Sequence, residues 1–262
     1  MIPRALITEW RANAPWALDE QVEQDLIVSR ALISLYSEDV LRREVAFRGG
    51  TALHKLFLAP PARYSEDIDL VQVEAGGIGA AMDAVHRSLD SWLGKPQWKQ
   101  GQGRVTFYYR FATEIEPVQQ KRFKVEINTR EHFSVHGLVQ RRLEVASRWW
   151  SGQAEITTYD LEELLATKLR ALYQRRKGRD LFDLWSALQI ERTDPKRIVR
   201  AFRRYMEAEE HHVTREEFEQ NLAAKIRVRA FTEDLRPLLT SGIHYDVGEA
   251  ATLVADRILA LL

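Results

Sequence analysis

The stretch "FRGGTALHKLFLAPPARYSEDIDLV", residues 47–71, places a Gly-Gly-Thr turn ahead of a dense acidic cluster that is predicted to be part of a strand. Side chains alternate along a strand, so Asp67 and Asp69 share one face, while Ile68 and Leu70 take the other. Two like charges held close together are unfavourable unless a cation compensates them. Mg²⁺ takes oxygen ligands and is usually held by one or two carboxylates plus substrate phosphates. The pair therefore predicts a metal site, although a solvated strand face would carry the same residues.

The Gly49-Gly50-Thr51 turn is suited to binding an anion. Two glycines let the backbone approach a phosphate closely, and the residues after them open a helix whose N–H groups and dipole favour negative charge. Thr51 adds a hydroxyl donor. A plain tight turn would look the same, but a phosphate-type turn followed 16 to 18 residues later by a carboxylate pair is more specific. Together the two features predict a site for a Mg-nucleotide.

Composition limits the classes of protein. The 262 residues are enough for one domain or two unequal ones, and the absence of cysteine excludes disulfides, zinc–thiolate sites and cysteine nucleophiles. It also suits a reducing cytoplasm, where we expect the protein. No apolar run approaches ~18 residues, so we expect neither a signal peptide nor a membrane span. The 38 basic and 38 acidic residues give no net charge, which leaves only a local basic patch for nucleic acid.

Hydrophobic periodicity predicts an α+β protein. Two strands are marked by clear alternation, "RVTFYYRF" (104–111) and "RFKVEIN" (122–128). We expect further strands at 44–48 and 66–73, and helices at 15–43, 51–58, 78–93, 160–176, 179–190, 194–209, 214–229 and 246–262. Strands packed with helices, followed by a purely helical half, predict a core domain over 1–155 and a helical domain over 156–262, with a seam near 148–159. Glu126 faces away from the apolar side of its strand and joins the Asp pair if the two strands are neighbours.

The segments "RGGTALHK" and "RYSEDIDLV" resemble the first motif of the AbiEii/AbiGii-type nucleotidyltransferase toxins, a group that includes the MenT toxins. The group belongs to the polymerase-β-like nucleotidyltransferase superfamily, whose pattern is Gly-Gly/Ser/Thr, a spacer, Asp-x-Asp and a distant third acid. "QVEQDLIVSRAL" is similar to the leading helix of the family, so the resemblance covers roughly residues 15–190. It implies a nucleotidyltransferase-type mixed sheet with flanking helices.

The stretch "DLEELLATKLRALYQRRKGRDLFDLW" (160–185) is the second informative one, and Asp160 with Glu163 predicts a capping box. Lys168 falls on the apolar stripe of its helix, which fits a lysine at the edge of the core or an inward ammonium that reaches the triphosphate. The resemblance favours the second interpretation, because "GRDLFDLW" looks like a later motif of the family. Asp180 and Asp183 are both candidate site residues: Asp180 for pairing with Lys168 or reaching the site, and Asp183 for contacting an arginine or the substrate. The alternatives are a carboxylate at the N-terminal end of the helix for Asp180 and a surface charge for Asp183.

A basic run lies between these two helices, and its residues are Arg175, Arg176, Lys177 and Arg179. With the arginines of the next helix, it is a candidate surface for an RNA backbone, although charge runs are more often solvated faces. Two adjacent residues, His211 and His212, point about 100° apart on a helix and are expected at the surface.

The resemblance implies nucleotidyl transfer. Asp67 and Asp69 would hold Mg²⁺ or Mn²⁺, and the glycine turn with Ser65 would hold the NTP phosphates. Glu126 would help activate the acceptor hydroxyl, and Lys168 would neutralise the departing pyrophosphate. The implied acceptor is the 3′ end of tRNA, and the implied partner is an antitoxin encoded nearby. There are three alternatives. Transfer to a protein or a small molecule would be detected with labelled NTPs, and a non-catalytic nucleotide-binding module would bind NTP in a titration without transfer. A metal-dependent nuclease would shorten RNA.

Overall fold

The computed structural model of the protein describes residues 2–189 and 193–262, which form two compact units. The first unit holds the chain up to Phe133 together with Leu138–Tyr159, and the second holds Ser134–Gly137 with Asp160–Leu262. Among the described residues, all strands belong to the first unit and the second is helical, so the α+β prediction is confirmed. None of the helices within these residues is both long and apolar enough to cross a bilayer.

The first unit is built on a mixed seven-stranded sheet in the order β3-β4-β5-β2-β1-β7-β6. The strands are β1 (Val45–Arg48), β2 (Ile68–Gln72), β3 (Gln97–Gly101), β4 (Arg104–Ala112), β5 (Gln120–Asn128), β6 (Leu138–Ala146) and β7 (Ser151–Tyr159). β2 lies antiparallel to β1 and parallel to β5, so the two segments that carry acidic candidates are neighbours at the centre of the sheet.

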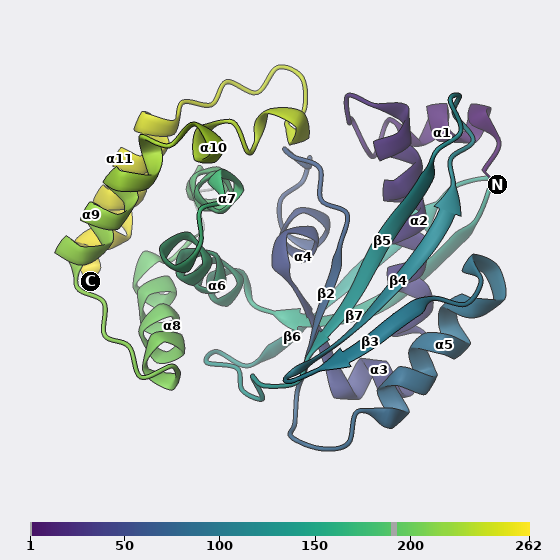
Figure 1. Ribbon diagram of the computed structural model, residues 1–262, viewed down its shortest axis with the longest axis horizontal. Helices are drawn as coiled ribbons and strands as arrows, with labels where there is room; N and C mark the ends of the chain where they lie inside the picture. The colour runs from purple at the N-terminus through teal and green to yellow at the C-terminus, as the bar shows by residue number, and fades with distance from the viewer. Residues whose placement is uncertain (1, 190–192) are drawn as a thin grey trace. The chain divides into compact units, whose positions relative to one another are not determined.

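One face of this sheet is apolar, and it packs against helices. Residues Val105, Phe107 and Tyr109 are buried, and the Tyr109 hydroxyl donates to Asp90 Oδ1 at 3.0 Å. Since Asp90 lies on α5, this helix covers the apolar face, while Figure 1 shows α4 beside β2 on the other side. The helices of the unit are α1 (Arg4–Trp10), α2 (Asp19–Tyr36), α3 (Asp39–Glu44), α4 (Gly49–Leu56) and α5 (Gly79–Leu93).

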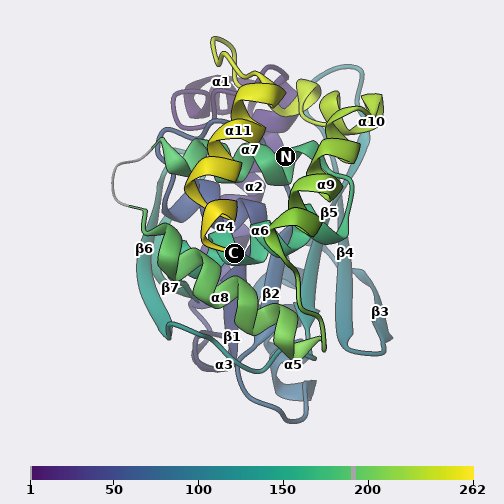
Figure 2. The same cartoon turned by 90° about the vertical axis from the view of Figure 1, so that its left-hand side faces the viewer.

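The second unit is a helical assembly, in which α11 packs across α7 (Figure 2). Its elements are α6 (Leu161–Gln174), α7 (Gly178–Leu188), α8 (Pro195–Ala208), α9 (Arg215–Ile226), α10 (Arg229–Thr232), η1 (Arg236–Leu238), α11 (Val247–Arg257) and η2 (Leu259–Leu261). Asp160 caps α6, as expected, by accepting from the backbone N–H of Glu163. The Glu163 side chain does not return the bond, because its buried carboxylate accepts from Ser134, Val135, His136 and Tyr205 instead.

Several sequence predictions of elements were incomplete. The helix expected over 15–43 is two helices, because α2 ends at Tyr36, where the Ser37 hydroxyl donates to Ile33 O at 2.8 Å. The two units divide after Tyr159, which is the last residue of the range 148–159 where the seam was expected, and β7 occupies most of that range. Helix α1 and strands β3, β6 and β7 were not predicted. The expected end of one helix at 190 lies outside the described residues.

Candidate active site

The acidic candidates meet on the sheet face opposite α5. Asp69 lies in β2 and pairs in register with Glu126 of the parallel strand β5, so the neighbouring strands on which the interpretation of Glu126 depended are present. Ile68 and Leu70 are buried on the apolar side, which leaves Asp69 on the accessible side. Asp67 was expected inside the strand, but β2 begins at Ile68 and Asp67 precedes it. The three carboxylates therefore come from two strands and the residue that leads into one of them.

A lysine that the sequence reasoning missed lies among these carboxylates. Lys124 Nζ is 3.4 Å from Asp69 Oδ1, 3.5 Å from Asp67 Oδ2 and 3.8 Å from Glu126 Oε2. Lys124 is two residues before Glu126 on β5, and so it shares the face of Glu126. The alternation of residues 122–128 in the sequence already places Lys124 and Glu126 on the same face of the strand. One ammonium therefore compensates three carboxylates, and the cluster keeps an excess of negative charge.

This arrangement changes the ionisation of the groups. Burial raises the pKa of Asp67 to about 6, with Asp69 and Glu66 adding to the rise and Lys124 opposing it. Burial lowers the pKa of Lys124, but Asp69, Asp67 and Glu126 together raise it above its ordinary value. At neutral pH Lys124 is therefore charged, and Asp67 is mostly ionised.

The glycine turn lies directly against the carboxylates. Gly49 has a φ of +85°, a conformation that side chains disfavour, and a Cβ built on it would lie 2.6 Å from Asp69 Oδ2. A Cβ on Gly50 would lie 2.5 Å from Nη2 of Arg63 and 3.1 Å from Oγ of Ser65. The turn thus has no room for side chains at either position, because Asp69 occupies one side and Arg63 with Ser65 the other.

Thr51 joins the turn to the acidic segment. Its buried hydroxyl donates to the carbonyl oxygen of Asp67 at 2.5 Å and lies 2.9 Å from Ser65 Oγ. Since a hydroxyl has one proton, Ser65 is the donor in the second bond. Thr51 was expected to donate to a phosphate, but here its proton fixes Asp67 relative to the turn. The role of Ser65 as a phosphate ligand stays a prediction.

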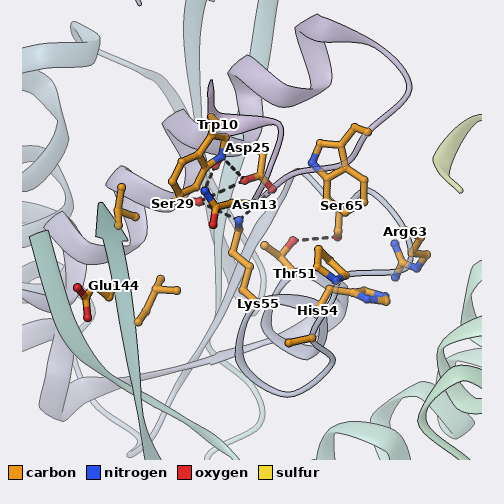
Figure 3. Close-up of a pocket in the computed structure, with 15 residues that line it drawn as sticks. Trp10, Asn13, Asp25, Ser29, Thr51, His54, Lys55, Arg63, Ser65 and Glu144 are labelled. Atoms are coloured by element: carbon orange, nitrogen blue, oxygen red, sulfur yellow. Dashed lines mark hydrogen bonds and ion pairs between the residues drawn. The ribbon is translucent and has the colours of Figure 1, made fainter. Parts of the chain in front are cut away.

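A cavity of about 160 Å³ is lined by residues of α2 and α4, and the contacts around it hold α4 in place (Figure 3). Lys55 of α4 places Nζ 3.0 Å from Asp25 Oδ2 and 2.8 Å from Ser29 Oγ, both on α2. The indole of Trp10 donates to the other oxygen of Asp25 at 2.9 Å. Asp25 is 4% exposed, so its charge depends on these partners. The Lys55–Asp25 ion pair, which no sequence pattern predicted, anchors α4 on α2 and so supports the turn at the start of α4.

The donor set suits a hard divalent cation. Carboxylates are the ligands that Mg²⁺ prefers, and Asp67, Asp69 and Glu126 all lie within 4 Å of one ammonium. No group of three acidic or imidazole side chains in residues 2–189 and 193–262 is arranged to hold a metal ion by itself. A Mg²⁺ held by Asp67 and Asp69 would therefore complete its coordination with phosphate oxygens and water, which is its usual mode.

The candidates from the helical half meet in the second unit. Lys168 Nζ lies 2.8 Å from Asp183 Oδ2 and 3.5 Å from Asp180 Oδ1. Arg175 reaches Asp180 from the other side through bonds of 2.7 and 2.8 Å. Both aspartates are fully buried, so the interpretation of Asp183 as a surface charge is wrong. The part that these residues play toward a triphosphate stays a prediction.

The basic run is partly neutralised by neighbours within its own unit. Arg175 pairs with Asp180, while Lys177 lies 3.4 Å and Arg179 4.0 Å from carboxylate oxygens of Asp234. Arg176 is exposed. Contact of this run with RNA therefore stays a prediction, and most of its charge already has a carboxylate partner. The adjacent residues His211 and His212 are exposed, as expected.

Comparison with known proteins adds a family to this geometry. Residues 30–252 match the family described as nucleotidyl transferase AbiEii toxin of type IV toxin–antitoxin systems. No curated protein sequence is significantly similar. Among solved structures, MenT4, a nucleotidyltransferase toxin from Mycobacterium tuberculosis H37Rv, has a TM-score of 0.70 at 19% identity, covering 100% of this chain and 91% of MenT4. JHP933 from Helicobacter pylori has a TM-score of 0.55 at 15% identity, covering 93% and 92%. At these low identities the solved structures show only that the fold is shared. The family match covers residues 30–252 and therefore shows the family.

Proposed function

The chain belongs to the AbiEii nucleotidyltransferase toxin family of type IV toxin–antitoxin systems, and we propose that it transfers a nucleoside monophosphate from an NTP to the 3′ end of tRNA, which blocks translation. The observation that carries this proposal is the contact between the Gly49 turn and Asp69, beside Asp67 and Glu126. A phosphate-type turn and a metal-type carboxylate cluster then serve one substrate. A metal-dependent nuclease would use the carboxylates but has no need for such a turn.

Each residue has a definite part in the proposed reaction. The turn binds the triphosphate through backbone N–H groups at the start of α4. Asp67 and Asp69 hold Mg²⁺, or Mn²⁺, which when bound stabilises charge on the attacking and leaving oxygens. Lys124 keeps the cluster compensated before the substrate arrives, and its ammonium then turns toward phosphate oxygens.

Glu126 acts as the base in this proposal. Its Oε2 accepts from the Thr106 hydroxyl at 3.2 Å, a bond that orients the carboxylate. The acceptor hydroxyl gives its proton to Glu126 while its oxygen forms a bond to the α-phosphorus. The bond from the α-phosphorus to the bridging oxygen breaks, and pyrophosphate leaves with that electron pair. Positioning of the reactants and electrostatic stabilisation of the developing charge together supply most of the rate enhancement in such a transfer.

Lys168 is proposed to neutralise charge on the departing pyrophosphate. Its ammonium is held by Asp183 and Asp180, which fixes its direction. The family implies two partners, an NTP and a cognate antitoxin. We place the reaction in the cytoplasm, where tRNA and NTPs are present.

The test is a transfer assay with the purified full chain, Mg²⁺ and each of the four labelled NTPs. Total tRNA, total cell protein and aminoglycosides are offered separately as acceptors. We expect label on tRNA, with lengthening at the 3′ end and release of pyrophosphate. Label on protein alone would show that the acceptor is wrong while the chemistry stands. NTP binding without transfer to any acceptor would exclude catalysis, and shortening of the RNA would indicate a nuclease.

A further inference from the structure

The sheet face that carries the carboxylates continues as a basic surface toward the β3 edge. Alternation along β4 and β5 places Arg104, Tyr108 and Arg110 on the face of Glu126, because their odd-numbered neighbours are buried on the apolar side. The register pairs Arg110 with Arg122 and Tyr108 with Lys124. β3 adds Lys99, which pairs with Thr106. We call Lys99, Arg104, Arg110 and Arg122 the cationic face.

The charges of the cationic face are not compensated. All four residues are exposed, and none forms an ion pair with any acidic side chain in the described part of the chain. Arg110 and Arg122 stand directly opposite each other, an arrangement that disfavours the isolated sheet. On the accessible side of these three strands, Glu126 is the one acidic residue of the described positions. Two arginines in this arrangement gain from a polyanion that bridges them.

An aromatic ring lies within the cationic face. The Cζ atom of Arg122 is 4.6 Å from the ring centroid of Tyr108, and Lys99 Nζ is 5.7 Å from it. Tyr108 is half-buried, so its position is fixed while part of the ring stays accessible. Aromatic rings flanked by cations are the usual platform for an unpaired base, because every base has a π-face that stacks.

The geometry leads from this surface to the proposed chemistry. Arg110 with Arg122, Tyr108 with Lys124, and Thr106 with Glu126 are successive pairs along the same two strands. Four residues of a strand span about 13 Å, so the arginine pair lies about 13 Å from Glu126 along the strands. We propose that the cationic face binds the phosphate backbone of the acceptor RNA, with a base on Tyr108, and delivers the 3′ hydroxyl to Glu126. This inference rests on the proposed function and names where its acceptor binds.

Binding of RNA without NTP and without Mg²⁺ tests the inference separately from catalysis. The probe is a fluorescent RNA hairpin with a single-stranded 3′ tail, titrated with the full chain at several salt concentrations. The variant is Arg110→Glu/Arg122→Glu. The control is Arg142→Glu/Arg215→Glu, which makes the same change in net charge at exposed arginines elsewhere on β6 and α9.

We expect the dissociation constant of Arg110→Glu/Arg122→Glu to rise at least tenfold. The slope of log K against log salt should fall by about 1.4, since each lost single-strand phosphate contact removes about 0.7. The control should stay within about threefold of the wild type. Tyr108→Ala should weaken binding of the tailed hairpin about fivefold to 150-fold but leave a blunt duplex unchanged, and Tyr108→Phe should restore the affinity, because it keeps the ring.

The possible outcomes are distinct. Wild-type RNA affinity and salt slope in Arg110→Glu/Arg122→Glu would overturn the inference, while tRNA labelling by that variant would leave the proposed function intact. Labelling of protein alone by the wild type would overturn the inference and the tRNA acceptor of the proposed function, while the nucleotidyl-transfer chemistry would stand. If the double variant keeps its RNA affinity but loses binding to an acidic polypeptide such as poly-glutamate, the cationic face serves a protein, and the inference is wrong. As a measurement that does not depend on variants, a 4-thiouridine in the tail should crosslink to a peptide within residues 97–128.

Discussion

The two units each contain a lysine between two aspartates, yet the two clusters differ in charge and exposure. The cluster of the second unit is balanced, because its two aspartates, Asp180 and Asp183, face two cations, Lys168 and Arg175. Both aspartates have no exposed surface. In the other cluster, Lys124 faces three carboxylates, and the side chains of Asp67 and Asp69 are 44% and 36% exposed. The first cluster is satisfied within its unit. The second has excess negative charge and access to solvent, which is what a cation-binding site needs.

The largest expected difference between the clusters is in stability. Lys168→Ala leaves two buried carboxylates without the ammonium, and removing one partner of a buried pair costs about 3–5 kcal/mol. Lys124→Ala should change the free energy of unfolding by less than about 1 kcal/mol, because Asp67 and Asp69 are only partly buried and water can replace the ammonium. Urea unfolding of both variants gives the comparison. Equal losses would show that the two clusters are the same kind of site. Loss of activity in Lys168→Ala has to be judged at the folded fraction that remains.

The second effect concerns catalysis. Asp69→Asn should lower the rate of nucleotidyl transfer by about 10³-fold, equivalent to about 4 kcal/mol, because it removes one of the two carboxylates proposed to hold Mg²⁺. The matched control is Glu66→Gln, which alters an exposed neighbouring acid that accepts from the Tyr64 hydroxyl at 3.0 Å. That variant should transfer at close to the wild-type rate. Normal activity in Asp69→Asn with an unchanged melting temperature would remove this cluster from the mechanism.

The third effect separates backbone strain from the close approach of Asp69. Gly49→Ala and Gly94→Ala both place a side chain at positive φ, +85° and +77°, which costs about 1–2 kcal/mol of stability. A Cβ at Gly94 has nothing within 4 Å, whereas one at Gly49 displaces Asp69. We therefore expect both variants to melt earlier, but only Gly49→Ala to weaken Mg-NTP binding in calorimetry. Equal NTP affinities would contradict the contact between turn and carboxylate.

The smallest expected effect is a pH dependence. The pKa of Asp67 is raised to about 6, so below pH 6 this carboxyl holds a proton and cannot ligate a cation. The affinity for Mg²⁺ should fall by up to about tenfold per pH unit below 6 and stay level above it. The folded state also binds more protons than the unfolded chain between about pH 4 and 6, so the free energy of unfolding decreases as pH rises through that window. Asp67→Asn should remove both dependences in Mg²⁺ titrations and urea unfolding.

The central site was largely predictable from local patterns, whereas the groups that support it were not. Alternation in 122–128 predicts the strand and the face of Glu126. A lysine on the open side of a strand is normally a solvated charge, so the pattern alone does not distinguish Lys124 as a partner of the carboxylates. The burial of Asp183 depends on Lys168, fifteen residues earlier on another helix. Helical spacing alone places an aspartate at the flank of a stripe and does not reveal such a partner.

The missed strands have a different cause. β3 is exposed along its whole length, and Val145 is the one buried residue of β6, so neither strand carries a clear alternation of buried apolar and exposed polar residues. Both are edge strands, where one side of the ladder faces solvent and charged residues are favoured. The sheet order also brings β7 next to β1 from more than a hundred residues away. Such pairing follows from packing of the whole sheet, and a single sequence does not show it.

The hydrogen bond between Thr51 and Asp67 has a consequence for engineering. It closes a loop with a sequence separation of 16, so the turn and Asp67 are held together at the two ends of that loop. Loop-closure entropy grows slowly, and each doubling of length costs only about 0.6 kcal/mol. The exposed tip at Ala59 and Pro60 is therefore a natural insertion point. A peptide tag or a fluorescent reporter inserted there should leave the hydrogen bond between Thr51 and Asp67, and so the position of Asp67 beside the turn, unchanged.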